Sequence, residues 1–258
     1  MFHRTSTMVA LLVAALVMGA ALPAAMADEA LDKAFETLET FDWGHDRNQL
    51  NPIDDAVVAA HDDAAAKKAL ETRLAAVLDT GAPHAAKDFA CRKLSLIGTA
   101  ESVPTLAKLL GDEKLSHMGR YALERIPADE ASKALRDALP KVGVINSIGV
   151  RRDAAATSAL VALLGDSDQQ VAGAAAAALG SIGNPEAAKA LGAFQAKAPD
   201  ALKLVATDAY LVCAGQLLAD GRRADAIVIY KSLSGEDQPR HVRTAAMRGM
   251  LAAASAGN

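Results

Sequence analysis

A short phrase that ends a helix recurs along the middle of this sequence. Ile97-Gly98, Ile126-Pro127, Ile148-Gly149 and Ile182-Gly183 each follow a helical apolar pattern, and the spacing between them is uneven. The phrase LAKLLGD at 106–112 returns as LVALLGD at 160–166. In both places an Asp stands where the next helix needs an N-cap. Two short antiparallel helices cannot bury their shared apolar face alone, so neighbouring pairs must stack. The pattern therefore predicts an all-α fold, an α-solenoid of antiparallel helical hairpins with helical caps.

The composition agrees with a stack of helices. Hydrophobic residues make up 52% of the chain, but aromatic residues only 3%. Roughly 60 of the residues are alanine, which favours helices over strands and argues against a β-sandwich, a barrel or one large core. The alanine-rich run 171–178 is suited to the place where helices of adjacent repeats approach most closely.

The chain divides into four parts: 1–27, a signal peptide; 28–82, an N-terminal helical cap; 83–198, the repeats; and 199–258, a C-terminal helical cap. The predicted helices and helical pairs are 28–43, 51–61, 63–79, 83–97, 101–110 with 114–126, 129–139 with 141–148, 153–164 with 169–182, 208–233 as a hairpin, and 241–254. Asn51 is the expected cap of the second helix, and Gly98 is expected in the left-handed conformation.

The first 27 residues have the layout of a secretory signal peptide. Arg4 is followed by an apolar run and by Ala25-Met26-Ala27, which predicts cleavage before Asp28 and export to the periplasm or an equivalent compartment. The alternative is a transmembrane anchor, but about 15 apolar residues fall short of the ~20 that a bilayer requires. No other segment is expected to approach that length, so we predict no membrane insertion after cleavage.

Cys91 and Cys213 are the two cysteines of the chain. An even number in an oxidising compartment is compatible with a disulfide. Both lie inside helical apolar patterns, however, and in a linear stack they would be too far apart to pair. We expect free, buried thiols.

The repeats resemble a known family. SVPTLAKLLGD, ATSALVALLGDSDQQVAGAAAAALGSIG and NPEAAKAL are similar to short HEAT-like repeats, from about Pro83 to Ala198. CRKLSLIGTAESVPTLAKLL, LSHMGRYALERIP and INSIGVRRDAAA resemble exported HEAT-repeat proteins of planctomycete-type bacteria. The resemblance implies that the second helix of each pair lines a concave face used for protein contacts. It implies no established chemistry.

Residues 208–233 depart from that pattern and resemble one tetratricopeptide unit. The residues that fit its motif are Tyr210, Ala214, Gly221, Ala226 and Tyr230. Such a unit is also a helical hairpin, so it is compatible with a terminal cap of the stack.

Motifs that would indicate catalysis are absent from the sequence. There is no G-x-x-x-x-G-K-[ST], G-x-S-x-G, H-E-x-x-H or C-x-x-C. Deoxyhypusine hydroxylases, which are built on HEAT-like repeats, need His-Glu steps that this chain lacks. We predict a non-catalytic scaffold or protein-binding module without cofactor or metal. Two alternatives remain: a lyase or chaperone of the phycobilin-lyase kind, acting on a chromophore-bearing protein, and a permanent structural subunit of an envelope complex.

The candidate partner-binding face lies on the predicted helix 114–126. His117, Arg120, Tyr121 and Glu124 share one polar side of it. Together they could bind a carboxylate or a charged side chain of a protein partner. The alternative is a solvated face with an Arg120–Glu124 pair.

Secondary candidates are Arg151, Arg152 and Trp43. Either arginine could bind a ligand, but a bond across repeats is the simpler role. Trp43 could anchor a partner, although we favour a plug over the open end of the first helical pair. Nucleic acid is not an expected partner, because the sequence has no basic stripe with interleaved aromatic residues and a formal net charge of −4.

Overall fold

The computed structural model describes residues 24–255, and within them the chain forms helices and no strands. The predicted signal peptide falls mostly outside the described residues; only its last four residues begin the first helix. The α-helices are α1 (Ala24–Thr40), α2 (Asn51–Ala59), α3 (Ala64–Leu78), α4 (His84–Ile97), α5 (Val103–Lys108), α6 (Ser116–Leu123), α7 (Asp129–Asp137), α8 (Val142–Arg151), α9 (Thr157–Leu163), α10 (Gln169–Ile182), α11 (Pro185–Lys197), α12 (Lys203–Ala219), α13 (Arg223–Ser232) and α14 (Arg240–Ser255). Short 3-10 turns lie between some of them.

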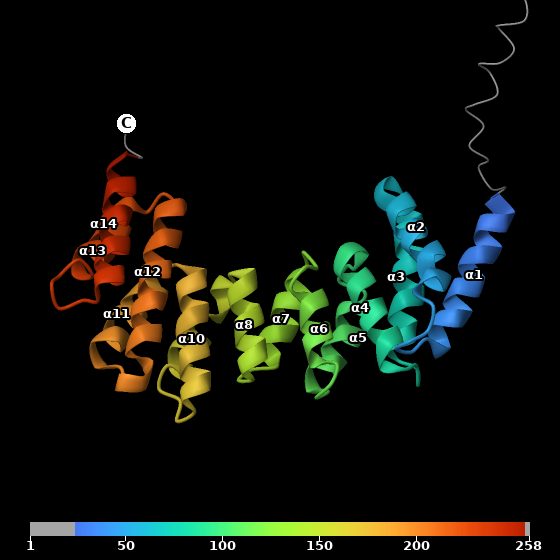
Figure 1. The fold of residues 1–258 in the computed structure, drawn as a ribbon, viewed down its shortest axis with the longest axis horizontal. Coiled ribbons are helices and arrows are strands. Elements are labelled where there is room, and N and C mark those ends of the chain that lie inside the picture. Colours follow the sequence, from blue (N-terminus) through green and yellow to red (C-terminus); the bar gives the residue numbers. More distant parts are fainter. Residues whose placement is uncertain (1–23, 256–258) are drawn as a thin grey trace, which may run out of the picture.

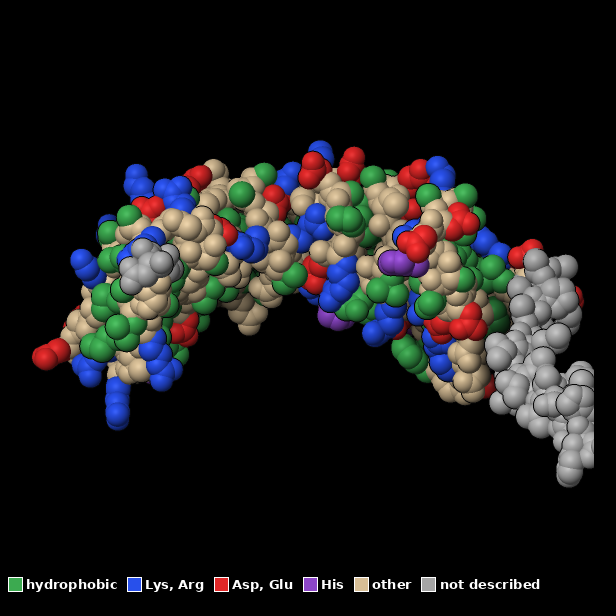
Figure 2. Space-filling view, turned by 90° about the horizontal axis from the view of Figure 1, so that it is seen from above, with side chains coloured by type: hydrophobic (Ala, Val, Ile, Leu, Met, Phe, Trp, Pro, Cys, Tyr) green, Lys and Arg blue, Asp and Glu red, His purple; other side chains and the backbone are tan. Residues whose placement is uncertain are grey.

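The helices form two layers. The even-numbered helices α4, α6, α8, α10, α12 and α14 contact one another in succession, and α3, α5 and α7 do the same behind them, as do α9 and α11. The even-numbered layer from α4 to α12 faces the viewer in Figure 1, with α5 and α7 behind it. Figure 2, seen from above, shows that the stack bends into an arch whose hollow side is this layer. The all-α solenoid is thus confirmed, with the second helices on the concave side.

The helix boundaries follow the predicted pairs closely, with three corrections. Asn51 is the first residue of α2 rather than its cap, and Asp46 caps the preceding 3-10 turn. Gly183 ends α10 in the left-handed conformation, with φ 65°, but Gly98 has φ −63° and is extended. Gly98 is needed for a different reason: a Cβ there would lie 2.5 Å from the Leu94 carbonyl oxygen. Finally, α8 continues past Ile148-Gly149 to Arg151.

The prediction that the two aspartates of the repeated phrase are N-caps of the second helices is wrong: Leu115 occupies the cap position of α6 and Asp168 that of α10, so each aspartate instead stabilises the turn before its helix. Asp112 Oδ1 accepts hydrogen bonds from the amides of Lys114 and Leu115, just before α6. These two bonds lower the pKa of the Asp112 carboxyl. Asp166 accepts from the amide of Asp168, and it is Asp168 that caps α10.

Glycine and alanine bring three inner helices very close together. A Cβ added to Gly149 of α8 would lie 2.9 Å from Cα of Ala178 in α10. One added to Gly180 of α10 would lie 2.6 Å from the carbonyl oxygen of Ala209 in α12. The expected close contact at the alanine-rich run is therefore confirmed.

The buried residues form a strip along the stack rather than one deep centre. The main apolar cluster runs from Ala34 in α1 to Ala246 in α14, and a second, small cluster joins Ala172, Ala198, Leu202 and Ala206. Cys91 and Cys213 belong to the main cluster and are both free, as predicted. Burial raises the pKa of each thiol to about 12, so both stay protonated at neutral pH.

The expectation that no segment after the first 27 residues approaches membrane-spanning length is wrong. Among the described residues, Asp200–Ala219 is long and apolar enough to cross a membrane by length and composition. In the fold its helix, α12, packs against α10, α11, α13 and α14, with Cys213 and Leu217 buried. A core helix of this kind meets the same two criteria, so the prediction of no membrane insertion is left untested.

Candidate functional site

Arg151 and Arg152, at the end of α8, hold neighbouring repeats together. Arg151 Nη1 donates to the carbonyls of Leu123 and Ile126, each at 2.7 Å, and Nη2 donates to that of Ala128 at 3.1 Å. These carbonyls lie at and just beyond the C-terminal end of α6, where helical partners run out. Desolvation on burial lowers the pKa of Arg151. This geometry gives Arg151 the bond across repeats that was the simpler of its two expected roles.

Arg152 reaches the other way along the stack. It has φ 51°, so the chain turns at this residue and its side chain leaves α8 in a different direction. Its Nη2 donates to Asp220 Oδ2 at 2.7 Å and to the Ile182 carbonyl at 3.4 Å. The two consecutive arginines therefore join α8 to the end of α6 before it and to the ends of α10 and α12 after it.

Two of the four residues predicted on α6 are also engaged between repeats. Arg120 Nη1 donates to the Gly143 carbonyl at 3.1 Å, and Glu124 Oε1 accepts from Ser147 Oγ at 2.8 Å. Both contacts join α6 to α8. The expected direct Arg120–Glu124 pair is replaced by these contacts with Gly143 and Ser147 of α8.

The other two differ in burial: His117 is exposed, whereas Tyr121 is half-buried and lies beside two arginines that the sequence did not single out. The guanidinium of Arg125 lies 3.8 Å from the centre of the Tyr121 ring, and that of Arg92 in α4 lies 5.9 Å from it. We name Arg92, His117, Tyr121 and Arg125 the inner-face cluster. Arg92 and Arg125 each also contact a carboxylate, Asp88 at 2.8 Å and Glu124 at 3.5 Å. Figure 2 shows Lys, Arg and His side chains gathered on the hollow side of the arch near its middle.

A cleft next to this cluster contains Trp43. Its volume is about 390 Å³, and its walls include Phe41, Phe89 and Arg47. Trp43 is 68% exposed, so the expectation that it plugs the end of the first helical pair is wrong. The loop after α1 carries it outward, while Phe41 is the aromatic residue that is buried there.

One carboxylate, that of Asp54, pairs with two of the cations that line the Trp43 cleft. Asp54 in α2 contacts Arg47 at 2.7 Å and also pairs with Lys93 of α4. Burial raises the pKa of Asp54, but the bonds from Lys93 and Arg47 outweigh it and hold the pKa below its usual range. Arg47 and Lys93 also lie over the Phe89 ring, at 4.6 and 5.2 Å.

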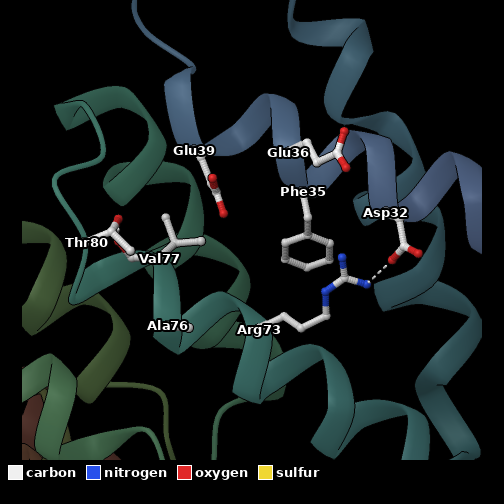
Figure 3. A pocket seen from close by; sticks show the side chains of 8 residues that line it. All are labelled: Asp32, Phe35, Glu36, Glu39, Arg73, Ala76, Val77 and Thr80. Atoms are coloured by element: carbon white, nitrogen blue, oxygen red, sulfur yellow. Dashed lines mark hydrogen bonds and ion pairs between the residues drawn. The ribbon is translucent and has the colours of Figure 1, made fainter.

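An acidic pocket of about 350 Å³ lies between α1 and α3 at the N-terminal end (Figure 3). Arg73 bonds to Asp32 at 2.8 Å and stacks on the Phe35 ring at 3.9 Å. Glu36 and Glu39 line the same pocket from α1. Sequence reasoning missed it, although the spacing of the three acids places them on one side of a helix.

Within residues 24–255, no three His, Cys, Asp or Glu side chains are placed to hold a metal ion together. What the described surface offers instead is a set of stacked aromatic and guanidinium groups on the inner face. Such groups bind carboxylates and aromatic or apolar side chains.

Comparison with known proteins gives fold likeness and one family match. No curated protein matches the chain. The complex of CpcE and CpcF of phycocyanin lyase from Nostoc is 17% identical, with a TM-score of 0.42, over 85% of this chain and 93% of that one. A designed armadillo repeat protein in complex with the peptide (KR)4 is 17% identical, with a TM-score of 0.34, over 86% and 98%. Human deoxyhypusine hydroxylase is 18% identical, with a TM-score of 0.31, over 72% and 98%.

The family match is to a part of the chain. Residues 141–210 match the family of HEAT repeats, from the start of α8 into α12. This range begins later than the resemblance noticed in the sequence and reaches further into the C-terminal hairpin. In that range the chain is similar to HEAT repeats.

Proposed function

We propose that this protein is a non-catalytic binding module that holds an extended segment of a partner protein on its concave face. The observation that carries the proposal is the inner-face cluster, in which Tyr121 lies beside two guanidiniums on the hollow side of the arch. Large side chains held in this way lose little freedom on binding, which favours affinity.

Apolar side chains flank the cluster on the neighbouring inner helices. Leu96 of α4 is 67% exposed and Val150 of α8 is 66% exposed. Each is the next-to-last residue of its helix, and Arg125 lies just beyond the end of α6. Because the inner helices run in the same direction, these three side chains occupy similar levels on consecutive helices. A partner segment crossing the helices would meet an apolar, a charged and a second apolar position in turn.

The chemistry of the cluster favours an acidic residue in the middle of that segment. Arg125 and Arg92 can both donate to a carboxylate, and the phenol of Tyr121 can donate to the same group. The Arg92 side chain is 56% exposed in its pair with Asp88, and a guanidinium has further N–H groups that can donate to a partner's carboxylate.

The test compares three baits in affinity capture from the native cell envelope, read by mass spectrometry. They are the unaltered chain, the double variant Tyr121→Ala/Arg125→Ala, and the control Lys189→Ala, which alters an exposed cation of α11 in the other layer. Proteins kept by the control and lost by the double variant support the proposal. An identical set on all three baits contradicts it.

Arg120 is a poor choice for such a variant. Its bond to the Gly143 carbonyl joins α6 to α8, so Arg120→Ala would weaken the stack as well as any binding. Equal melting temperatures of the double variant and the unaltered chain are therefore a required control.

We also infer that the protein is exported and cleaved before Asp28. The support is the sequence of the first 27 residues alone. N-terminal sequencing of the native protein tests it: a first residue of Asp28 is expected, and an intact Met1 would contradict it.

We infer further that the α12–α13 hairpin is a tetratricopeptide-like cap. Its turn contains Gly221 with φ 79°, and Ala226 and Tyr230 are buried in the second helix. Pairing it with tetratricopeptide units of known structure is the test, and a helix crossing unlike theirs would contradict it.

A further inference from the structure

The N-terminal end of the stack carries an apolar groove with an acidic rim. It lies between α1, α2 and α3 and has a volume of about 640 Å³. Most of its lining is small and apolar: Ala30, Leu31, Pro52, Ala56, Ala59, Ala60, Ala66, Ala69 and Leu70. Because six of these lining residues are alanine, another helix could approach the groove closely.

Carboxylates dominate the edge of this N-terminal groove. Asp28, Asp55 and Asp63 line it, and all three are exposed. Arg73 is the one cation in its lining, and Arg73 is paired with Asp32 at 2.8 Å. Glu36 and Glu39, in the adjoining pocket of Figure 3, extend the acidic surface along α1.

The opposite end of the stack carries a helix of opposite character. Helix α14 has no acidic residue and contains three arginines and His241. One side of it, with Val242, Ala246 and Ala253, is buried against the stack. The other side is open: Met247 is 50% exposed, Leu251 is 69% exposed, and His241 and Arg248 are exposed as well.

We propose that copies of this chain associate head to tail, with the exposed side of α14 in one copy docked in the N-terminal groove of the next. Met247 and Leu251 would lie on the alanine lining, and Arg248 and His241 would face the aspartates of the rim. Opposite charges at the edge of an apolar contact guide encounter and orient the partners. The two surfaces lie at opposite ends of the molecule (Figure 1), so the contact is heterologous and adds further copies instead of closing a dimer.

Sedimentation velocity of the purified mature chain, which begins at Asp28 after the proposed cleavage, tests the association at increasing concentration. From about 1 to 200 μM, a range that covers weak specific contacts, the average mass should rise beyond that of a dimer at low salt. It should return toward the monomer when salt screens the rim charges. A chain that stays monomeric throughout, or stops at a salt-insensitive dimer, overturns the proposal.

Charge reversal identifies the two surfaces. Asp55→Lys and Arg248→Glu should each weaken association at least tenfold, and the double variant should restore it, because the reversed charges attract again. Lys189→Glu, on the outer helix α11, is the matched control and should leave association unchanged. Equal effects of all three single variants, or a double variant weaker than either of its parents, overturn the proposal.

Disulfide cross-linking is a second test, which stays informative if the charge-reversal variants fold less well than the unaltered chain. Copies with Asp55→Cys and copies with Arg248→Cys, mixed under mild oxidation, should form a disulfide-linked pair, because docking would bring these two positions together. The chain's own thiols are buried and should not compete. Replacing the second copy with Lys189→Cys should abolish the product. Equal cross-linking in both mixtures contradicts head-to-tail docking.

Discussion

At the scale of single residues, Arg151 is the side chain on which the middle of the stack depends most. Its guanidinium donates to four carbonyls at and just beyond the end of α6 and also to Ser132 Oγ at 2.9 Å. We expect Arg151→Met to lower the free energy of unfolding by about 2–4 kcal/mol, since several part-buried carbonyls lose their donor. Urea unfolding followed by circular dichroism measures the loss. Lys189→Met is the control, and a loss no larger than the control's would contradict this role.

The raised pKa values of the two thiols predict how the free energy of unfolding changes at alkaline pH. An unfolded thiol ionises near pH 8.5, whereas in the folded chain burial raises the pKa of Cys91 and Cys213 to about 12. Above about pH 8.5 the unfolded state therefore binds fewer protons, and each thiol lowers the free energy of unfolding by up to about 1.4 kcal/mol per pH unit. Below that pH neither contributes a slope.

Unfolding of the Cys91→Ala/Cys213→Ala variant between pH 7 and pH 9.5 checks this. Its free energy should fall less steeply with pH than that of the unaltered chain. The upper limit avoids the range of Tyr210 and Tyr230, whose pKa values burial also raises. Parallel slopes for the two proteins would show that the thiols do not set the alkaline limit.

At the scale of elements, two glycines of α10 should respond in opposite ways to the same substitution. At Gly180 a Cβ would lie 2.6 Å from the Ala209 carbonyl oxygen, so Gly180→Ala must push α10 and α12 apart and should cost about 1–3 kcal/mol. At Gly173 the nearest atom would be Cδ2 of Leu202 at 3.5 Å, an ordinary contact. Gly173→Ala should therefore stabilise by about 0.5–1 kcal/mol through helix propensity. Thermal unfolding decides between them, and two shifts of the same sign would contradict the close approach.

The helices themselves were largely predictable, because apolar spacing and stop residues are local signals. The pairs from α5 to α10 and the last helix all lie close to their predicted positions. What failed depended on contacts between repeats. Gly98 is extended, and a Cβ there would meet both the Leu94 carbonyl of its own helix and Cδ1 of Ile126 in the next repeat, while α8 continues past Gly149, which lies against α10.

The same distinction explains the candidate site. Sequence spacing correctly placed four polar residues along α6, but only the fold reveals that Arg120 and Glu124 turn toward α8. It likewise brings Arg92, from a different helix, within 5.9 Å of the Tyr121 ring. Position on one helix follows from the sequence, whereas the choice between solvent and a neighbouring repeat depends on how the helices stack.

At the scale of the whole molecule, stability should vary along the stack. Apart from the Arg152–Asp220 pair, each helical pair packs mainly against its neighbours, so the ends are held on one side and the middle on both. In hydrogen exchange, the amides of α10, which packs against α8 on one side and α12 on the other, should be the slowest, and those of α1 and α14 the fastest. Uniform protection from end to end would contradict a stack of nearest-neighbour contacts.

The glycine and alanine contacts from α8 to α12 also limit what the arch can hold. Backbones that already touch have no long side chains between them to change rotamer, so this half of the stack has little means of altering its curvature. The spacing between consecutive inner helices is therefore constant in this half of the stack. If the proposed partner segment continues from α8 onto α10 and α12, its side chains must match that interval, and one residue inserted or deleted in the segment would misplace all the contacts that follow.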